Sequence, residues 1–348
     1  MPKAFPPRSF PSEDPIHWLI RSPNPLGDAC MALPAVRALR AAYPKGRITV
    51  CTRENLSPLW EAQPEVDHVI GFGKGLSPWQ VGKTLRSTGL TFDRGLLLPN
   101  SFRSALELRF GGVSRLVGYN RSGRGFLLSQ GIAAPTETPE RRHQAFRYLH
   151  LATSAGADDS RASEWMARPA APRPIEHDQR ELHLGICPGA EYGNAKRYPI
   201  ERYAEAVARC RARFPERTIR VSVYGSPAER DIGESLISLI AGPRANLAGS
   251  TSIAGLVDEL RTCHLLATND TGTMHLAASL GVPTVAIFGS TDPTLTAPLG
   301  EGHEVVQHKV DCNPCFLREC PIDYRCMLRI EASQVADAMA AVVSRPRS

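Results

Sequence analysis

The sequence has no long apolar run: none of its hydrophobic stretches approaches the roughly 18 residues that a membrane-spanning helix requires. Its amino-terminal segment, residues 1–8, also lacks the apolar core and small-residue cleavage site of a signal peptide, so we expect a flexible lead-in. The nine cysteines are an odd number, and most lie scattered in apolar segments, which fits a reducing compartment better than a disulfide framework. These absences together predict a cytoplasmic protein.

Three motifs of nucleotide and ester chemistry are also absent. The chain has no Asp-x-Asp pair for a metal-bound nucleotide sugar and no Gly-x-x-x-x-Gly-Lys-Ser/Thr phosphate loop. The Gly-x-Ser-x-Gly turn that carries a nucleophilic serine is missing as well. Any phosphate-binding site in this protein must therefore be built from other groups.

The composition is that of a soluble globular protein with more than one domain. The chain has 348 residues, of which 42% are hydrophobic and 22% charged, and this length suits two domains of ordinary size. The formal net charge of +6 favours acidic partners in general. Nucleotides, phosphorylated glycolipids, anionic membrane surfaces and nucleic acids all belong to that class.

Apolar strand patterns alternate with helical patterns in both halves of the chain, which is typical of α/β domains. In the first half, strands are predicted at 16–21, 48–51, 69–72 and 94–98, with helices at 31–43 and 79–87. In the second half, strands are predicted at 182–187, 219–225, 263–267 and 284–289, with helices at 202–213 and 276–281. Pro34 either opens or kinks the first of these helices. The proline-rich stretch 168–174 marks the domain boundary, so we expect domains at 16–170 and 181–330 and a last segment at 331–348.

The most informative stretch, 268–275, lies between an apolar strand and a helix. Its sequence is Thr-Asn-Asp-Thr-Gly-Thr-Met-His, a polar turn that contains a glycine. Asp270 or Thr271 can cap the helix. Backbone N–H groups from Thr271 to Thr273, together with the positive end of the helix dipole, would then point at a phosphate. An ordinary capped helix in an α/β sheet fits the same residues.

Three further loops follow predicted strands, and each has two interpretations. The loop 189–199 contains the adjacent cations Lys196 and Arg197, so it can wrap a diphosphate or be a solvated surface loop. Glu229, after the next strand, can bind a ribose hydroxyl or simply start a helix. Asp28 opens a helix in the first half and is either an N-cap or a functional carboxylate.

Four motifs stand in order along the chain: Pro-Leu-Gly-Asp at 25–28, Leu-Pro-Asn-Ser-Phe-Arg-Ser-Ala-Leu at 98–106, Pro-Gly-Ala-Glu-Tyr-Gly-Asn-Ala-Lys-Arg-Tyr-Pro at 188–199, and the turn at 268–275. Together they resemble the bacterial lipopolysaccharide heptosyltransferases of glycosyltransferase family 9, the heptosyltransferase II branch in particular. The resemblance implies a GT-B fold, in which two Rossmann-like domains face each other across a cleft. It implies that an ADP-activated heptose binds mainly to the C-terminal domain, and that the final helix, at 332–343, returns to the N-terminal domain.

The resemblance also implies roles for individual residues. Asp28 matches the catalytic base, which takes the proton of the acceptor hydroxyl as that hydroxyl attacks the anomeric carbon with inversion. Lys196 matches the cation that neutralises the leaving diphosphate. The other donor-binding residues would be Asp270, Thr271, Gly272, Thr273 and His275, with Glu229 on the ribose. A carboxylate at a helix N-terminus has its charged form stabilised, which opposes the role of Asp28 unless domain closure desolvates it.

The implied substrates are ADP-heptose and a lipid A-core acceptor, so the enzyme would be peripheral at the cytoplasmic face of the inner membrane. Catalysis would require no cofactor, because a helix N-terminus and Lys196 can stabilise the charge on ADP without a metal. Asn100, Ser101 and Arg103 would border the acceptor, with Arg103 near a phosphate or carboxylate of the inner core. The same turn can instead simply cap the next helix.

Two other classes of protein stay open at this point. A nucleotide-sugar epimerase or hydrolase could use the same two-domain cleft, and it would act on the donor without a lipid acceptor. A nucleic-acid-binding protein would use the basic charge on phosphates, although the resemblance implies no nucleic-acid partner. Product analysis separates the first class from a transferase, and steep salt dependence of DNA or RNA binding would reveal the second.

A cluster of four cysteines lies near the end of the chain, with two, four and five residues between successive members: Cys312, Cys315, Cys320 and Cys326. Four thiolates can form a tetrahedral structural zinc site or hold an iron–sulfur cluster. The alternative is a set of reduced, partly buried thiols that pin a loop near the donor. If a metal binds, we expect it to be structural and to lie away from the chemistry.

Overall fold

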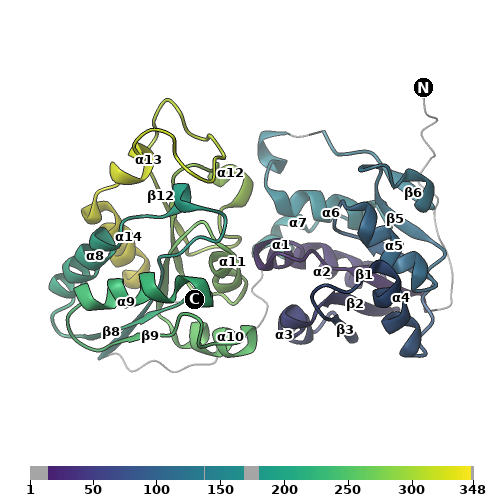
Figure 1. The fold of residues 1–348 in the computed structure, drawn as a ribbon, viewed down its shortest axis with the longest axis horizontal. Helices are drawn as coiled ribbons and strands as arrows, with labels where there is room; N and C mark the ends of the chain where they lie inside the picture. The colour runs from purple at the N-terminus through teal and green to yellow at the C-terminus, as the bar shows by residue number, and fades with distance from the viewer. Residues whose placement is uncertain (1–14, 137, 168–179, 346–348) are drawn as a thin grey trace. The chain divides into compact units, whose positions relative to one another are not determined.

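The computed structural model describes residues 15–136, 138–167 and 180–345, which form two compact units (Figure 1). The first unit ends at Met166 and the second begins at Ala167. This division falls directly before the predicted boundary at 168–174, which itself lies outside the described residues. Each unit contains a six-stranded sheet in which all paired strands are parallel, as the alternating pattern predicts.

The two sheets have the same strand order. The first contains β1 (His17–Arg21), β2 (Arg47–Arg53), β3 (His68–Phe72), β4 (Arg94–Leu97), β5 (Leu116–Tyr119) and β6 (Gln130–Ile132). The second contains β7 (Glu181–Cys187), β8 (Thr218–Val223), β9 (Arg244–Asn246), β10 (Leu265–Asn269), β11 (Thr284–Phe288) and β12 (Glu304–Gln307). The orders are β3-β2-β1-β4-β5-β6 and β9-β8-β7-β10-β11-β12, which is the Rossmann order. Each order reverses beside the first strand of its unit, and open α/β sheets bind ligands at the carboxyl ends of the strands that flank this point.

Helices connect the strands. The first unit has α1 (Leu26–Met31), α2 (Leu33–Ala42), α3 (Ser57–Glu61), α4 (Pro78–Ser87), α5 (Phe102–Phe110), α6 (Gln144–Ser154) and α7 (Ala162–Ala167). The second has α8 (Ile200–Arg213), α9 (Arg230–Leu239), α10 (Ile253–Thr262), α11 (Gly272–Ser279), α12 (Pro293–Thr296), α13 (Arg325–Leu328) and α14 (Ala332–Ser344). The helix predicted at 31–43 is divided at Ala32, and Pro34 lies in the first turn of α2, so Pro34 opens a helix. Every helix in the described ranges is too short or too polar to cross a bilayer.

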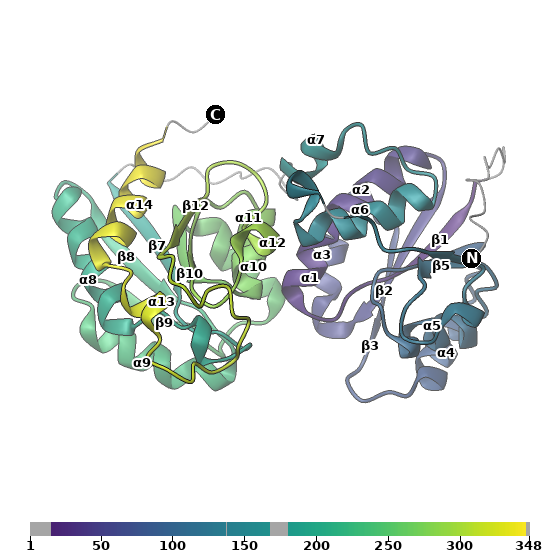
Figure 2. The ribbon, with the colours of Figure 1, turned by 90° about the horizontal axis from the view of Figure 1, so that it is seen from above.

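The first sheet is covered by helices on both faces, because successive side chains of a strand point to opposite sides. Leu19 of β1 packs in one apolar cluster with Val81 of α4 and Leu108 of α5. The neighbouring residues Trp18 and Ile20 point the other way and are fully buried. Figure 2 shows α2 and α6 on the face opposite α4 and α5.

Helix α14 completes the core of the second unit. Its residues Val335 and Met339 are buried in the cluster that contains Leu184 and Val285 of the sheet. The helix packs against α8 and against β10, β11 and β12. The expectation that the helix at 332–343 would join the N-terminal domain is therefore corrected, because its apolar face is buried within the second unit.

Candidate active site

A pocket of about 350 Å³ lies where the strand order of the first unit reverses. Its walls come from the loops after β1 and β4, from β5 and from α6. The lining residues are Pro23, Asn24, Pro25, Asp28, Leu98, Pro99, Asn100, Ser101, Tyr119, Gln144, Arg147 and Tyr148. Three of the residues expected from the sequence, Asp28, Asn100 and Ser101, thus share one polar pocket.

Asp28 lies in the first turn of α1 and is held by a residue of α6. The hydroxyl of Tyr148 donates to Asp28 Oδ1 at 3.1 Å, and Gln144 Nε2 lies 3.4 Å from the Tyr148 oxygen. Burial raises the pKa of Asp28, and the hydrogen bond from Tyr148 offsets only part of this, so the pKa is above its ordinary value. The carboxylate is therefore a stronger base than its place at a helix N-terminus alone suggests.

The sequence did not predict a site role for Tyr148, because a tyrosine on a helix is usually a core residue. Its side chain is buried in α6, which packs against α1 and α2. Burial and the neighbouring Asp28 carboxylate both raise the pKa of Tyr148, so the hydroxyl stays protonated and acts as a donor. The chain offers no local signal for this pairing, since the two residues are 120 positions apart.

The loop after β4 is fixed by a buried arginine that the sequence analysis also missed. Arg124 Nη1 donates to Pro99 O at 2.5 Å and to Ser101 O at 3.1 Å, and its side chain is fully buried. Burial lowers the pKa of Arg124 to about 10. Ser101 Oγ accepts from the backbone N–H of Ser104 at 3.2 Å and so caps α5. Ser101 therefore caps α5 and also lines the pocket beside Asn100, while its role beside an acceptor stays a prediction.

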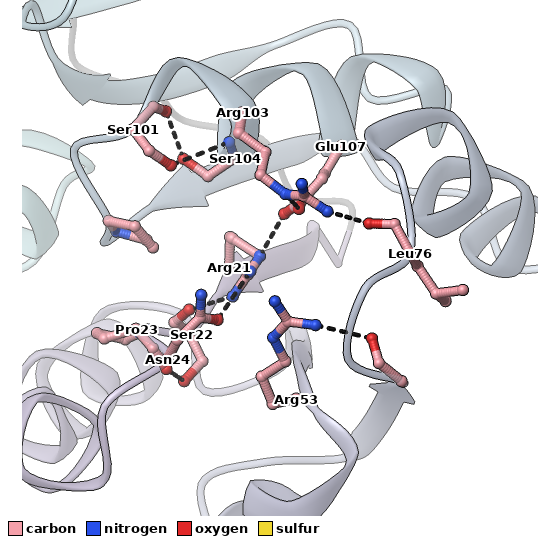
Figure 3. A network of polar contacts seen from close by, with 12 residues as sticks. Arg21, Ser22, Pro23, Asn24, Arg53, Leu76, Ser101, Arg103, Ser104 and Glu107 are labelled. Carbon is pink, nitrogen blue, oxygen red and sulfur yellow. Dashed lines mark hydrogen bonds and ion pairs between the residues drawn. The ribbon is translucent and has the colours of Figure 1, made fainter.

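Arg103 is not among the residues that line this pocket. Its Nε donates to Glu107 Oε1 at 3.0 Å, and its guanidinium also donates to Leu76 O (Figure 3). Arg21 Nε donates to the other oxygen of Glu107 at 2.7 Å, and these two side chains are only 2% and 1% exposed. Arg21 also donates to Asn24 Oδ1 at 3.0 Å, so the network supports the loop after β1. Arg103 thus supports the loops around the pocket, and its expected place beside an acceptor anion stays a prediction.

In the second unit, the loops after β7, β10 and β11 meet at one ion pair. Lys196 Nζ lies 2.5 Å from Asp270 Oδ2, and Thr291 Oγ1 donates to the same oxygen at 2.8 Å. The Lys196 and Asp270 side chains are 12% and 6% exposed. The two sequence motifs that carry these residues are therefore brought together, and Asp270 holds Lys196 in an ion pair.

Asn269, the last residue of β10, holds the loop after β7 and was not singled out by sequence. Its amide nitrogen donates to Pro188 O at 2.7 Å and to Gly189 O at 3.1 Å. Its oxygen accepts from Tyr198 N at 3.2 Å and from the Tyr203 hydroxyl at 3.0 Å. Its position between an apolar strand and a polar turn could have indicated this role, because a buried Asn needs hydrogen-bond partners.

Helix α11 begins without a side-chain cap. Thr271 occupies the N-cap position in extended geometry, but its hydroxyl lies 3.3 Å from Thr268 Oγ1 and 3.9 Å from the Cys187 sulfur. The Thr273 hydroxyl also faces the Cys187 thiol, while burial raises the pKa of that thiol to about 11. These side chains pack toward β7, and no side chain caps the first backbone N–H groups of α11, the type of helix N-terminus that favours an anion.

The remaining donor-side residues have structural contacts. Glu229 Oε2 accepts from Ser226 N at 2.8 Å in a capping box at the start of the turn that precedes α9. Its other carboxylate oxygen lies against Gly189, where an added Cβ would be only 2.0 Å away. His275 is buried in α11, with 6% of its surface exposed. Glu229 thus caps a helix and also borders the loop that carries Lys196.

The cysteine segment, residues 312–326, packs against two of these loops. Ser290 O, directly after β11, accepts from Cys315 N at 3.0 Å and from Phe316 N at 2.8 Å. Ala195 N donates to Arg318 O at 2.9 Å. The backbone of the cysteine segment is therefore hydrogen-bonded to the loop that carries Lys196 and to the loop after β11.

The thiols of the segment differ in environment. Cys312 is exposed and Cys326 is buried. Burial alone would raise the pKa of Cys320, but the backbone N–H groups of Ile322, Tyr324 and Asp323 hold it below its ordinary value. Burial and the other three thiols raise the pKa of Cys326. Within the described residues, no group of three or more His, Cys, Asp or Glu side chains is arranged to hold a metal ion.

Most of the sequence also matches a known family. The sequence model of glycosyltransferase family 9 (heptosyltransferase) matches residues 79–325. The chain belongs to this family. It is therefore a glycosyltransferase, and its two Rossmann-like units are those of the GT-B fold.

Individual relatives match most of this family 9 chain. It is 29% identical over 320 residues to lipopolysaccharide heptosyltransferase 2 of Escherichia coli, with 84% of this chain and 89% of that protein covered. It is 30% identical over 316 residues to lipooligosaccharide heptosyltransferase 2 of Haemophilus ducreyi, with 83% and 88% covered. The solved structure of E. coli ADP-heptose LPS heptosyltransferase II superposes with a TM-score of 0.74 at 26% identity, over 94% of this chain and 98% of that one.

Proposed function

We propose that this glycosyltransferase moves heptose from ADP-L-glycero-D-manno-heptose onto the first heptose of the lipopolysaccharide inner core, with inversion and without a metal. The observation that carries the proposal is the half-buried Asp28 carboxylate, whose pKa is raised inside a polar pocket and whose Oδ1 accepts a hydrogen bond from Tyr148. The names of the similar proteins supply the sugar and the acceptor class. A base of this kind suits the activation of an acceptor hydroxyl.

In the proposed reaction, an acceptor hydroxyl bound in the pocket of the first unit attacks the anomeric carbon of the heptose. The new bond forms between the hydroxyl oxygen and that carbon, while the bond from carbon to the diphosphate oxygen breaks. The proton of the hydroxyl passes to Asp28, and the electron pair of the broken bond leaves on ADP. Attack from the face opposite the leaving group gives inversion.

The donor would bind at the carboxyl ends of β7 and β10 in the second unit. Lys196 and the uncapped start of α11 lie there, and both favour an anion. Fixed cations and backbone dipoles stabilise the charge that develops on ADP without any reorganisation in the transition state. This supports a mechanism that needs no metal. Glu229 borders the same loop and is the proposed partner of the ribose.

The acceptor is amphiphilic, so we place the enzyme at the cytoplasmic face of the inner membrane as a peripheral protein. The net charge of +6 favours contact with anionic lipid headgroups there. Residues Asn100 and Ser101 line the pocket beside Asp28 and would contact the acceptor sugar.

The test is turnover of ADP-heptose with a set of defined, truncated lipopolysaccharide acceptors, read by mass spectrometry. We expect a mass gain of one heptose only on acceptors that already carry the first heptose, at equal rates with and without EDTA. Conversion of the donor alone would indicate an epimerase or hydrolase. Strict dependence on added magnesium would contradict the metal-free mechanism.

A further inference from the structure

One aromatic ring joins the loop of Lys196 to the cysteine segment. Lys196 Nζ lies 4.7 Å from the centroid of the Tyr192 ring, and the guanidinium carbon of Arg318 lies 5.2 Å from the same centroid. The Tyr192 hydroxyl donates to Phe316 O at 2.7 Å, which fixes the ring against the cysteine segment. Two cations therefore meet on one ring that is 38% exposed.

Lys196 has a carboxylate partner that compensates its charge, whereas Arg318 has none within the described residues. Lys196 lies 2.5 Å from Asp270 Oδ2, so much of its charge is already compensated. Arg318 is exposed and has no carboxylate partner in the part of the chain that the structure describes. A diphosphate that approaches the Lys196–Asp270 pair would therefore meet a net positive charge that comes mainly from Arg318. A guanidinium also offers phosphate a planar pair of N–H donors, which an ammonium group lacks.

The backbone holds Arg318 in this place. Its carbonyl oxygen accepts from Ala195 N at 2.9 Å, directly before Lys196 in the chain. Gly193 has a φ of 152°, and a Cβ at this position would lie 2.3 Å from Arg318 O. Only glycine allows both this conformation and this close approach. The loop and the cysteine segment are thus built to lie against each other.

A second set of contacts ties the same segment to the loop after β11. Ser290 O accepts two backbone N–H groups of the segment, and Asn313 Nδ2 donates to Gly289 O at 3.2 Å. The next residue, Thr291, donates to Asp270, the anchor of Lys196. The segment therefore contacts both loops that position the Lys196–Asp270 pair.

We propose that Lys196, Tyr192 and Arg318 form the diphosphate subsite for the nucleotide-sugar donor, and that the cysteine segment belongs to the donor site because it supplies the second cation. The inference rests on the proposed function for the identity of the donor. Arg318 contributes charge and a planar donor pair, while Tyr192 fixes the separation of the two cations.

The test compares the affinity of Arg318→Gln and wild-type protein for ADP and for inorganic pyrophosphate by isothermal titration calorimetry. We expect Arg318→Gln to bind both ligands about 5- to 30-fold more weakly, with a shallower salt dependence than wild type. The matched control is Arg329→Gln, an exposed arginine that follows α13 in the same unit, which should bind both as wild type does. Unchanged ADP and pyrophosphate affinity in a folded Arg318→Gln protein would overturn the subsite.

A double-mutant cycle tests whether Arg318 and Tyr192 act together in ADP binding, or whether Arg318→Gln merely disturbs the structure around position 318. Tyr192→Leu removes the shared ring, so Arg318→Gln should weaken ADP binding less in that background than in wild type. Fully additive effects would contradict the role of Tyr192. A different result would refute the proposed function. If wild-type protein bound ADP but transferred no heptose to any acceptor, the heptosyltransferase proposal would be wrong. The comparison of Arg318→Gln with wild type would still decide whether Arg318 belongs to the diphosphate subsite.

Discussion

The hydroxyl of Tyr148 on α6 donates a 3.1 Å hydrogen bond to Oδ1 of Asp28 on α1. No other hydrogen bond to the Asp28 side chain occurs within the described residues, which leaves Oδ2 for the proton of an acceptor. Burial raises the pKa of this carboxyl, and the bond from Tyr148 lowers it in part. Tyr148 thus orients the Asp28 carboxylate and limits the rise of its pKa, so we expect it to be a positioning residue for the proposed base.

Tyr148→Phe should move the acidic limb of the kcat/KM profile to higher pH. In the proposed mechanism Asp28 is the base, so activity should fall as pH drops through its pKa, and loss of a hydrogen bond to the charged form raises that pKa further. The rate should therefore fall most at acidic pH and recover at alkaline pH. Tyr119→Phe is the matched control, because Tyr119 lines the same pocket but its hydroxyl donates to Arg147 O at 2.6 Å. An acidic limb that stays in place in Tyr148→Phe would refute the positioning role.

Asp28→Ala should lower kcat by about 10²- to 10⁴-fold, the usual range for loss of a general base. ADP affinity should stay close to that of wild type, because Asp28 belongs to the first unit and the proposed donor site to the second. Steady-state kinetics and calorimetry check the two parts separately. Near-normal turnover by a folded variant would show that another group accepts the proton.

Lys196→Ala should weaken ADP and ADP-heptose by a similar factor, on the order of 10- to 100-fold. The charge that Lys196 meets is present in the ground state and in the transition state, so both ligands feel its loss. Asp270→Asn removes the carboxylate that both positions Lys196 at 2.5 Å and compensates its charge, so a loss of ADP affinity in this variant would report lost positioning and not lost positive charge. If calorimetry found wild-type ADP affinity in the Lys196→Ala protein, the diphosphate would have to bind elsewhere.

Asn100→Ala should raise the KM for the acceptor and leave that for the donor unchanged, because Asn100 lines the pocket of Asp28. Arg103→Ala provides the comparison. Its guanidinium is 46% exposed and bound to Glu107, which keeps its partner Arg21, so we expect a loss of about 0–1 kcal/mol in stability and little kinetic change. A large rise in acceptor KM for Arg103→Ala alone would restore its expected role beside an acceptor anion.

The four cysteines of the segment should be reduced thiols in the purified protein. The backbone contacts to Ser290 and Ala195 hold the segment in place. We expect far less than one zinc or iron per chain by elemental analysis of protein purified without chelator, and thiol titration should find all four reactive after unfolding. About one zinc per chain would establish the tetrahedral site that the spacing of Cys312, Cys315, Cys320 and Cys326 suggests.

Local patterns were sufficient for most of the fold. Apolar runs located the strands, with small shifts such as β10, which covers Leu265–Asn269 rather than the predicted 263–267. The shift matters because it makes Asn269 the end of the strand, where its amide holds the loop after β7. Periodicity marks the apolar core of an element well, but the end of a strand depends on its pairing with β7 and β11.

The sequence by itself determined the two α/β units and the family motifs around Asp28, Lys196 and Asp270, because these depend on residues close together in the chain. Only the tertiary structure decided how distant residues act on each other. Packing forms the hydrogen bond between Tyr148 and Asp28. It also forms the ion pair between Arg103 and Glu107 and the cation–π contact between Arg318 and Tyr192. The physical reason is that burial, charge compensation and hydrogen bonding between distant segments arise from packing, which local sequence patterns do not encode.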